Sequence, residues 1–381
     1  MKNNTPHIRV LYLITLLDRL GGAEKNLCDI VLNLNRKRFT PYVVVFKGGD
    51  VSSYLAERGI AVIENGVTKL ISLHSLVKAW ELYRLFRREH IDVVVTYHHD
   101  ADIFGSIVGA LTGVPVISSR RDMGYQLTKK HIWFYRRFGS LFSHFITVSN
   151  AVKNKIMRRE GISAEKITTI YNGIDSDLFN HDDFVKKQAL RSELGLSSDM
   201  MTIGMVASFR PIKGQHYLVE AIESMKEWHG KIQIVVIGYN DTDYFRTVTR
   251  KINNAGLERQ FFFPGARDDI PDLLSLFDIF VISSVNEGFS NAIIEAMAAG
   301  IPVVAADSGG NREAVVHDQT GLLFHPCDSV ALAKALTTLL NNKSLLKKFA
   351  KAGKKRVQEK FTLDKMIAAN EIVYQKNWQE L

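Results

Sequence analysis

Residues 202–214 read TIGMVASFRPIKG and join a short apolar run to a basic turn. The run from Thr202 to Ala207 is largely apolar on both alternating faces, which is typical of a parallel strand covered by helices on both sides. Arg210 and Lys213 follow where the carboxyl end of this strand meets a loop. Ligands of α/β sheets bind at that end of the strands. The stretch therefore predicts an α/β domain whose loop can clamp a diphosphate, although a basic pair on a loop is more often simply part of the surface.

The same pattern recurs along the chain, with a short run rich in Val and Ile followed by a longer amphipathic segment. In the first half the runs are Ile8 to Leu17, Pro41 to Phe46, Ile60 to Ile63, Ile91 to Thr96, Val114 to Ser118 and His144 to Val148. In the second half they are Thr202 to Ala207, Ile232 to Ile237, Gln260 to Phe263, Ile279 to Ser283 and Pro302 to Ala306. Right-handed helical crossovers between buried parallel strands explain this spacing. We expect two doubly wound α/β units in tandem, with a ligand cleft where they face each other.

The length of 381 residues suits two domains of ordinary size. The polar stretch from Ser176 to Lys187 has no clear period, so the domain junction is expected between residues 175 and 200. We place the N-terminal domain at 1–180 and the C-terminal domain at 181–360. Residues 361–381 predict a helix that packs back toward the N-terminal domain.

The composition is that of a packed globular protein, with 46% hydrophobic and 23% charged residues. Lys and Arg number 49 against 40 Asp and Glu, which gives a net charge of +9. This excess favours an anionic partner, namely nucleic acid, a lipid surface or a phosphorylated substrate.

The two cysteines and the apolar runs indicate where the protein works. Cys28 and Cys327 lie far apart and have no CxxC or Cys/His companions, so neither a disulfide framework nor a zinc site is expected. The apolar run from Ile8 to Leu17 contains Arg9 and lacks a signal-peptide cleavage site. No other stretch approaches the ~20 apolar residues that cross a bilayer. We predict a cytoplasmic protein with at most peripheral membrane contact.

Two polar segments follow predicted strands in the first half. Gly21-Gly22-Ala23-Glu24 precedes a helix whose free N–H groups attract phosphate, although a plain tight turn explains the glycines equally well. Residues 97–102, reading YHHDAD, can hydrogen-bond a sugar or position an acceptor, and the alternative is a solvated loop. Side chains of adjacent residues on an extended chain point apart, so at most one of His98 and His99 is expected to face a ligand.

Residues 287–295 read EGFSNAIIE and carry the densest set of candidate ligands in the second half. The candidates are Glu287, Gly288, Phe289, Ser290, Asn291 and Glu295. A helix that begins near Ser290 places Asn291 and Glu295 on one face and presents backbone N–H groups at its start. Glu287 can then reach a bound sugar, while Glu295 accepts hydrogen bonds from a ribose.

This nine-residue stretch resembles the E-x7-E element of the family 4 retaining glycosyltransferases, which have the GT-B fold of two facing Rossmann-like domains with parallel sheets. Other segments fall in that family's order: Gly21-Gly22-Ala23-Glu24, Val148-Ser149-Asn150, Tyr171-Asn172-Gly173-Ile174-Asp175, Arg210 with Lys213-Gly214, Phe263-Pro264-Gly265-Ala266-Arg267 and Gly309-Gly310. The resemblance covers nearly the whole chain. It implies sugar transfer from a nucleotide-sugar donor to an acceptor, with retention at the anomeric carbon and without a metal or other cofactor.

The resemblance also implies a donor-binding set, which is Gly21, Gly22, Arg210, Lys213, Arg267, Glu287, Gly288, Phe289, Ser290, Asn291 and Glu295. Within this set, Arg210 and Lys213 hold the diphosphate and act in catalysis. Glu287 acts on the donor sugar, Glu295 contacts the ribose and Arg267 lies beside the base.

A catalytic histidine is common in the family near residues 98–100. In this sequence His99 and Asp100 both remain candidates for that place, because one alignment puts Asp100 there.

The donor and acceptor are less constrained by the motifs. A UDP-sugar is favoured over GDP-mannose, and a glycan or lipid-linked acceptor of polysaccharide or lipopolysaccharide assembly is the usual setting of relatives. A diphosphate leaving group can itself take the acceptor's proton on the same face of the sugar, so no separate base is required. The alternatives are a nucleotide-sugar epimerase of the same fold and a non-enzymatic anion-binding protein. No nucleic-acid motif is present, so nucleic acid is not an expected partner.

The positive charge is concentrated between residues 120 and 160, where ten basic residues stand against two acidic ones. The acceptor-side candidates in this stretch are Arg120, Arg121, Lys129, Lys130, Arg136 and Arg137. Aromatic residues are interleaved with them, which predicts a basic aromatic surface that docks on anionic lipid or a lipid-linked diphosphate. We therefore expect association with the cytoplasmic face of the inner membrane, whereas the alternative is a solvated face over an ordinary core helix.

Overall fold

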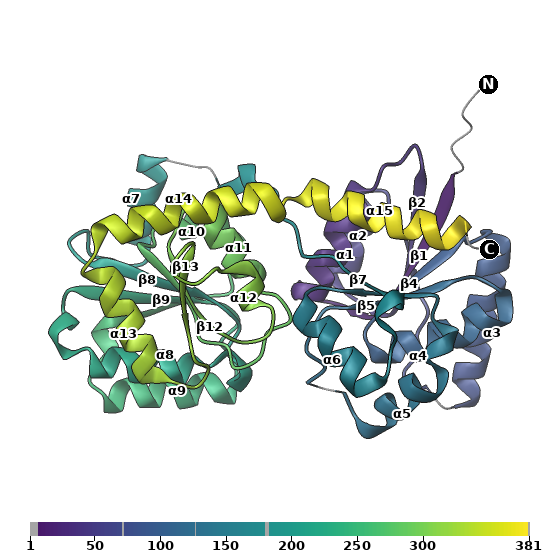
Figure 1. Cartoon of the computed structure of the whole chain (residues 1–381), viewed down its shortest axis with the longest axis horizontal. Helices are drawn as coiled ribbons and strands as arrows, with labels where there is room; N and C mark the ends of the chain where they lie inside the picture. Colours follow the sequence, from purple (N-terminus) through teal and green to yellow (C-terminus); the bar gives the residue numbers. More distant parts are fainter. Residues whose placement is uncertain (1–6, 71, 126, 180–182, 380–381) are drawn as a thin grey trace. The chain divides into compact units, whose positions relative to one another are not determined.

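The computed structural model describes residues 7–70, 72–125, 127–179 and 183–379. They form two compact units, called unit 1 and unit 2 below (Figure 1). Unit 1 ends at Asn172 and takes in the segment from Asp364 onward, while unit 2 spans the residues between them. Ile174 belongs to unit 2 because its backbone exchanges hydrogen bonds with Phe361 and Leu363. The division therefore falls a few residues before position 180.

Unit 1 is built on a parallel sheet with the strand order β3-β2-β1-β4-β5-β6-β7. Its strands are β1 (Ile8–Leu17), β2 (Phe39–Gly48), β3 (Ala61–Glu64), β4 (Val93–Tyr97), β5 (Val116–Arg120), β6 (His144–Thr147) and β7 (Ile167–Thr169). Its helices are α1 (Gly22–Asn33), α2 (Asp50–Glu57), α3 (Leu73–Arg88), α4 (His99–Thr112), α5 (Lys129–Phe138), α6 (Asn150–Glu160) and α15 (Leu363–Gln379). Right-handed crossovers place α1 and α2 on one face of this sheet and α3 to α6 on the other.

The last helix, α15, packs within unit 1 beside α1 and β1 (Figure 1). The ring of Tyr374 meets the ring of Tyr12 edge-on, with centroids 6.1 Å apart. The backbone N–H of Asn35 donates to the Glu371 carboxylate at 2.8 Å. Aromatic and polar contacts thus attach α15 to β1 and to the segment that follows α1.

Unit 2 repeats the plan with the strand order β10-β9-β8-β11-β12-β13, again all parallel. Its strands are β8 (Met201–Val206), β9 (Ile232–Ile237), β10 (Phe261–Gly265), β11 (Ile279–Ile282), β12 (Val303–Ala306) and β13 (Gly321–Phe324). Its helices are α7 (Phe184–Glu193), α8 (Gln215–Ser224), α9 (Asp243–Asn254), α10 (Ile270–Leu274), α11 (Asn291–Ala298), α12 (Asn311–Ala314), α13 (Ser329–Leu340) and α14 (Lys343–Lys360).

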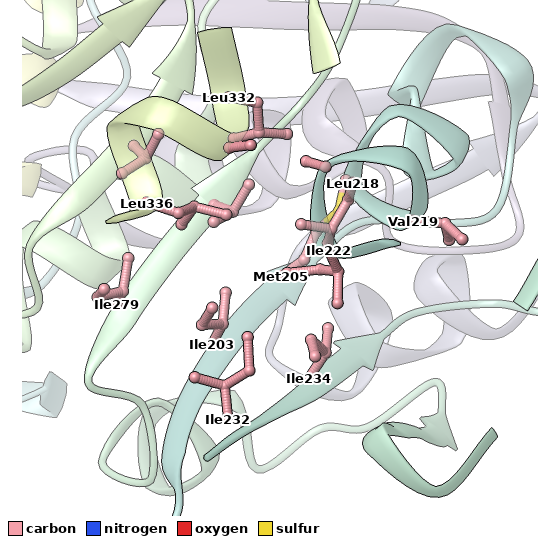
Figure 2. Packing of buried hydrophobic residues seen from close by; sticks show 14 of the residues in the cluster. Ile203, Met205, Leu218, Val219, Ile222, Ile232, Ile234, Ile279, Leu332 and Leu336 are labelled. Atoms are coloured by element: carbon pink, nitrogen blue, oxygen red, sulfur yellow. The ribbon is translucent and has the colours of Figure 1, made fainter. Parts of the chain in front are cut away.

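The core of unit 2 lies between the central strands and the helices α8 and α13. Figure 2 shows Ile203 and Ile234 of the sheet with Ile222 of α8 and Leu336 of α13, all of which are fully or almost fully buried. Burial of one such side chain contributes about 1.5–3 kcal/mol. The pairing of aliphatic strands with one apolar helix face fixes both helices on the same side of the sheet.

The prediction of two parallel α/β units is confirmed, and each of the eleven expected runs overlaps a strand. Strands β7 and β13 were not predicted. Both are short, of three and four residues, and lie at the edge of their sheets.

Candidate functional site

Both sheets reverse their strand order beside their first strand. In unit 1 the strand β1 lies between β2 and β4, and in unit 2 the strand β8 lies between β9 and β11. The helices that follow the two neighbouring strands leave to opposite faces, which opens a crevice at the carboxyl ends of the strands. The candidate site residues of each unit are therefore expected on the loops after β1 and β4, and after β8 and β11.

The loop after β8 is held against the end of β11. Gly214 has a φ of 67°, and a Cβ at this position would lie 2.3 Å from the carbonyl oxygen of Ser283. Only glycine permits this approach. The Ser283 hydroxyl donates to the carbonyl oxygen of Gly214 at 2.9 Å. These contacts position Arg210 and Lys213, which flank Pro211 and Ile212 in the same loop.

Lys213 forms an ion pair with Glu287, and Nζ lies 2.5 Å from Oε1. The exposed fractions of the two side chains are only 22% and 11%, so solvent screens this pair less than a surface pair. Arg210 is exposed, and its side chain has no hydrogen bond or ion pair with another described residue. The structure therefore places Glu287, which we expect to bind the sugar, in direct contact with Lys213, which we expect to bind the diphosphate.

The backbone of Glu287 is fixed by the loop after β12. The N–H of Gly310 donates to the carbonyl oxygen of Glu287 at 3.1 Å. Gly309 has a φ of 53°, and a Cβ on it would lie 1.7 Å from the same oxygen. The Gly309-Gly310 pair thus acts by letting two loops meet backbone to backbone.

Helix α11 begins at Asn291, with Ser290 as its N-cap, so the predicted start of this helix is confirmed. Glu295 is 8% exposed and lies one turn into the helix. Phe289 is buried against Phe361 with ring centroids 5.3 Å apart. The loop after β11 and the start of α11 together carry Glu287, Gly288, Phe289, Ser290, Asn291 and Glu295.

Arg267 follows β10 and is engaged by two carboxylates. Its guanidinium donates twice to Asp269, at 2.8 and 2.7 Å, and once to Glu193 at 2.6 Å. The hydrogen bond from Arg267 lowers the pKa of Asp269 below its ordinary value. None of these contacts reaches the Lys213–Glu287 pair, so the structure does not join Arg267 to that pair.

In unit 1, Glu24 and His98 come together from the loops after β1 and β4. The His98 Nε2 atom lies 3.5 Å from Glu24 Oε1. Gly21 is the N-cap of α1, and Glu24 lies in the first turn of that helix. His98 has φ 72° and ψ 153°, a backbone conformation that is strained for any residue with a Cβ. Sequence reasoning favoured His99 and Asp100, whereas the structure places His98 beside the Gly21–Glu24 loop.

His99 belongs instead to a buried polar network with Tyr135 and Asp102. Tyr135 Oη donates to Asp102 Oδ2 at 2.6 Å and lies 3.0 Å from His99 Nδ1. Because the hydroxyl proton goes to Asp102, the Nδ1 atom of His99 is the donor in the second contact. Burial lowers the pKa of His99 to about 2, so the ring is neutral at physiological pH. Asp100 has another neighbour, and its Oδ1 lies 3.6 Å from His131 Nε2.

Arg120 belongs to the same network, and the prediction that it lies on a basic surface is wrong. The side chain is buried, donates to Asp102 at 3.1 Å and to Glu160 at 2.6 Å, and stacks on Tyr135. A buried guanidinium needs such carboxylate partners. The exposed basic residues of the predicted surface are Lys129, Lys130, Arg136 and Arg137 of α5, together with Arg158 of α6.

Metal-binding clusters and membrane-spanning helices are both absent from the part of the chain that the structure describes. Its residues contain no cluster of three or more His, Cys, Asp or Glu side chains that is arranged to hold a metal ion. Over the same residues, no helix combines the length and the apolar character required to span a bilayer.

Comparison with models of protein families identifies the family of the chain that carries these two sites. The model of the group 1 glycosyl transferases matches residues 186–356, and the model of glycosyltransferase family 4 matches residues 20–178. Together the two matches cover the sites of both units. The chain belongs to the group 1 glycosyltransferases of the GT-B fold.

Individual relatives of this glycosyltransferase match over nearly their full length. The UDP-Gal:alpha-D-GlcNAc-diphosphoundecaprenol alpha-1,3-galactosyltransferase of Escherichia coli is 25% identical, with 91% of each chain covered. The capsular polysaccharide biosynthesis glycosyltransferase CapM of Staphylococcus aureus is 24% identical, with 86% of this chain and 88% of CapM covered. Among solved structures, HepE from Anabaena in complex with UDP and glucose shares 25% of its sequence with this chain. The two structures superpose with a TM-score of 0.87 over 97% of this chain and all of HepE.

The substitution Gly309→Ala tests whether the contact between the two loops positions Glu287. The new Cβ would collide with the Glu287 carbonyl oxygen, and a displacement of about 1 Å at a reacting centre can lower a rate roughly 100-fold. Gly300→Ala is the matched control, because Gly300 also has positive φ but a Cβ added there would meet nothing within 4 Å. Equal transfer rates in the two variants would contradict this role of Gly309.

The substitution His99→Gln tests the buried network through pH. The folded-state pKa of His99, about 2, lies below the ordinary 6.5, so protons bind the unfolded chain preferentially and stability is lost as pH falls below 6.5. The loss reaches up to about 1.4 kcal/mol per pH unit. We expect His99→Gln to lose less stability than the wild type between pH 7 and 5.5 in thermal unfolding. His74→Gln, at an exposed site, should behave as the wild type, and a slope unchanged in His99→Gln would refute the assignment.

Proposed function

We propose that this glycosyltransferase moves a sugar from a nucleotide-sugar donor to a glycan or lipid-linked acceptor in surface polysaccharide or lipopolysaccharide assembly, and that unit 2 binds the donor. The observation that carries the proposal is the 2.5 Å Lys213–Glu287 pair beside the exposed Arg210. Two cations that can neutralise a phosphate thus lie where the strand order of one sheet reverses. The carboxylate at the same place can accept hydrogen bonds from sugar hydroxyls. The names of the capsule and diphosphoundecaprenol relatives support the assembly role.

A UDP-sugar is the donor that we favour over GDP-mannose. HepE binds UDP and glucose in its structure, and the Escherichia coli relative is named for UDP-Gal. In the proposed complex Arg210 and Lys213 contact the diphosphate, Glu295 accepts hydrogen bonds from the ribose and Glu287 contacts the sugar. Arg267 would lie beside the base while its guanidinium is held by Asp269 and Glu193.

The proposed reaction retains the anomeric configuration and requires no metal or other cofactor. The bond from the anomeric carbon to the diphosphate breaks, the acceptor oxygen bonds to that carbon on the same face, and the acceptor proton passes to an oxygen of the departing phosphate. Negative charge grows on the diphosphate, so Arg210 and Lys213 stabilise the transition state more than the bound donor. Lys213 would exchange Glu287 for a phosphate oxygen as the donor binds. Trapping a covalent sugar on the active enzyme would contradict this route.

Thermal unfolding with nucleotides tests the donor assignment. We expect UDP to raise the unfolding temperature more than GDP does, because the proposed donor is a UDP-sugar. A ligand that binds only the folded state stabilises it by about 2.7 kcal/mol at a concentration of 100 times its Kd. Arg210→Ala should weaken the UDP effect about tenfold or more, since it removes a charged hydrogen bond.

Arg246→Ala is the control, because this exposed arginine of α9 pairs only with Asp243 in the described structure. A UDP response that survives unchanged in Arg210→Ala, or is lost equally in Arg246→Ala, would count against the proposed clamp.

We further propose that unit 1 contacts an anionic membrane. On α5, Trp133 is 62% exposed among the exposed residues Lys129, Lys130, Arg136 and Arg137. Exposed aromatic and basic side chains together are the combination that binds the interface of anionic lipids. This supports a membrane-bound acceptor, such as the diphosphoundecaprenol in the name of the relative.

Helix α3, on the same face of the sheet as α5, carries a second exposed apolar surface. It packs against α4, which in turn contacts the turn directly after α5 (Figure 1). Its outward residues Leu73, Leu76 and Trp80 are 84%, 68% and 60% exposed, and they share one helix face with Arg84 and Arg87. Exposed apolar side chains that share one helix face are a candidate interaction site.

Vesicle binding tests the membrane proposal. We expect the protein to co-sediment at low salt with vesicles that contain phosphatidylglycerol and not with phosphatidylcholine alone. Replacing Leu76 and Trp80 by Ser should weaken this binding about tenfold, because their burial in the interface is lost. The same change at Phe184 and Val185 of α7, which are 69% and 77% exposed, is the control. Binding that does not depend on lipid charge, or is unaffected by the α3 changes, would overturn it.

A further inference from the structure

Two consecutive arginines at the end of β5 have opposite environments. Arg120 is the last residue of the strand, and its guanidinium is satisfied by Asp102 and Glu160. Arg121 follows it, and because successive side chains of an extended chain alternate, it turns to the other face of the sheet. There its Nη2 atom donates to Asn172 Oδ1. Within the described structure, Arg121 makes no ion pair with a carboxylate.

The charge of Arg121 is poorly compensated for its depth. Its Nε atom is buried and has no hydrogen-bond partner among the described residues. Desolvation lowers the pKa of Arg121, and the groups that oppose this effect are the phenols Tyr97 and Tyr374 rather than a carboxylate. A cation held out of water without an anion costs stability. The side chain is only partly covered as a whole, so a ligand can still reach it.

Arg121 lies at the carboxyl edge of the unit 1 sheet, among polar groups that fix its surroundings. Tyr97, the last residue of β4, donates its hydroxyl to Asn26 Oδ1 at 3.0 Å. Asn26 in turn donates to Asn172 Oδ1 at 3.3 Å, the same atom that accepts from Arg121. Asn26 is one turn into α1, whose N-cap Gly21 provides no side-chain cap. The acidic residue of that first turn, Glu24, lies against His98.

The chain of contacts from Arg121 to α1 thus contains amides and phenols and no acidic group. The positive end of the α1 dipole lies on the same edge of the sheet. An anionic group of a substrate would supply the partner that Arg121 lacks, and a guanidinium is well suited to bind phosphate through two oxygens.

We propose that Arg121 binds a phosphoryl group of a substrate within unit 1, as a site additional to the Arg210 and Lys213 clamp of unit 2. The proposal deepens the proposed glycosyltransferase function and rests on it for the identity of the substrate. The ligand is a phosphate or diphosphate ester. It comes either from the nucleotide-sugar donor or from a phosphorylated acceptor, and the experiment below separates these sources.

Inorganic pyrophosphate is the probe, and thermal unfolding of the full chain is the readout. We expect the doubly substituted protein Arg210→Ala with Lys213→Ala to keep a pyrophosphate-dependent rise in unfolding temperature, because Arg121 is intact. Adding Arg121→Met should weaken this response about tenfold or more, since a charged hydrogen bond to phosphate is lost. Adding Arg121→Lys instead should retain part of it. The proposal is wrong if the residual response is absent, or if it is equal with and without Arg121→Met.

Stability without ligand separates this role from a structural one. Arg121→Met in the otherwise unchanged chain should unfold at the same temperature as the wild type or higher, because it removes an uncompensated buried charge. Arg120→Met is the control and should unfold at a clearly lower temperature, because it leaves Asp102 and Glu160 buried without their cation. A loss of stability in Arg121→Met as large as in Arg120→Met would overturn the proposal.

UDP identifies the source of the phosphate. If Arg121→Met weakens the UDP response, the donor supplies the group, and if the UDP response is unchanged, the acceptor supplies it. Either outcome supports a phosphate ligand only together with the pyrophosphate result. Failure of the wild type to respond to UDP at all would instead contradict the proposed donor, and it would leave the pyrophosphate test of Arg121 intact.

Discussion

The reversal of strand order beside the first strand of each sheet is the constraint on which the rest of the structure depends. Because β1 and β8 each have neighbours whose helices leave to opposite faces, a crevice forms at the carboxyl ends of these strands. The Glu24–His98 contact arises at this point in unit 1, and the Lys213–Glu287 contact arises at it in unit 2. Both pairs join loops that are more than 70 residues apart in sequence. Topology therefore brings the candidate site residues together, and the glycines of the loops in unit 2 allow the backbones to approach.

Much of the fold could be predicted because a buried parallel strand is apolar on both faces and leaves a visible run. Strands β7 and β13 left no such run, since Ile167–Thr169 contains two threonines and Gly321–Phe324 begins with glycine. The residue types and loops of the candidate site could be predicted from the sequence. Which side chains contact one another could be predicted less well. Whether His98 or His99 faces the Gly21 loop depends on the positive φ of His98, which tertiary contacts impose and which no residue pattern near it indicates.

The basic residues of unit 1 differ in how far their charge is compensated by acidic partners. The sequence presents Arg120 and Arg121 as an equivalent pair, and only the fold shows that one has two carboxylate partners and the other has an amide. The buried Arg120–Glu160 pair adds no net charge to the 120–160 segment, so the positive excess of this segment comes from its other basic residues. What remains at the surface lies mainly on α5, on the same face as the exposed apolar stripe of α3. Burial and partners thus distinguish three environments among neighbouring basic residues.

We propose that Lys213 and Glu287 form a donor site in which their ion pair is replaced by contacts with a phosphate and a sugar. A crystal structure of the protein with a bound UDP-sugar tests this most directly. We expect the diphosphate to contact Arg210 and Lys213, with Lys213 Nζ moved away from the Glu287 carboxylate and that carboxylate in contact with the sugar. A UDP-sugar bound elsewhere, with the 2.5 Å Lys213–Glu287 pair intact, would contradict it.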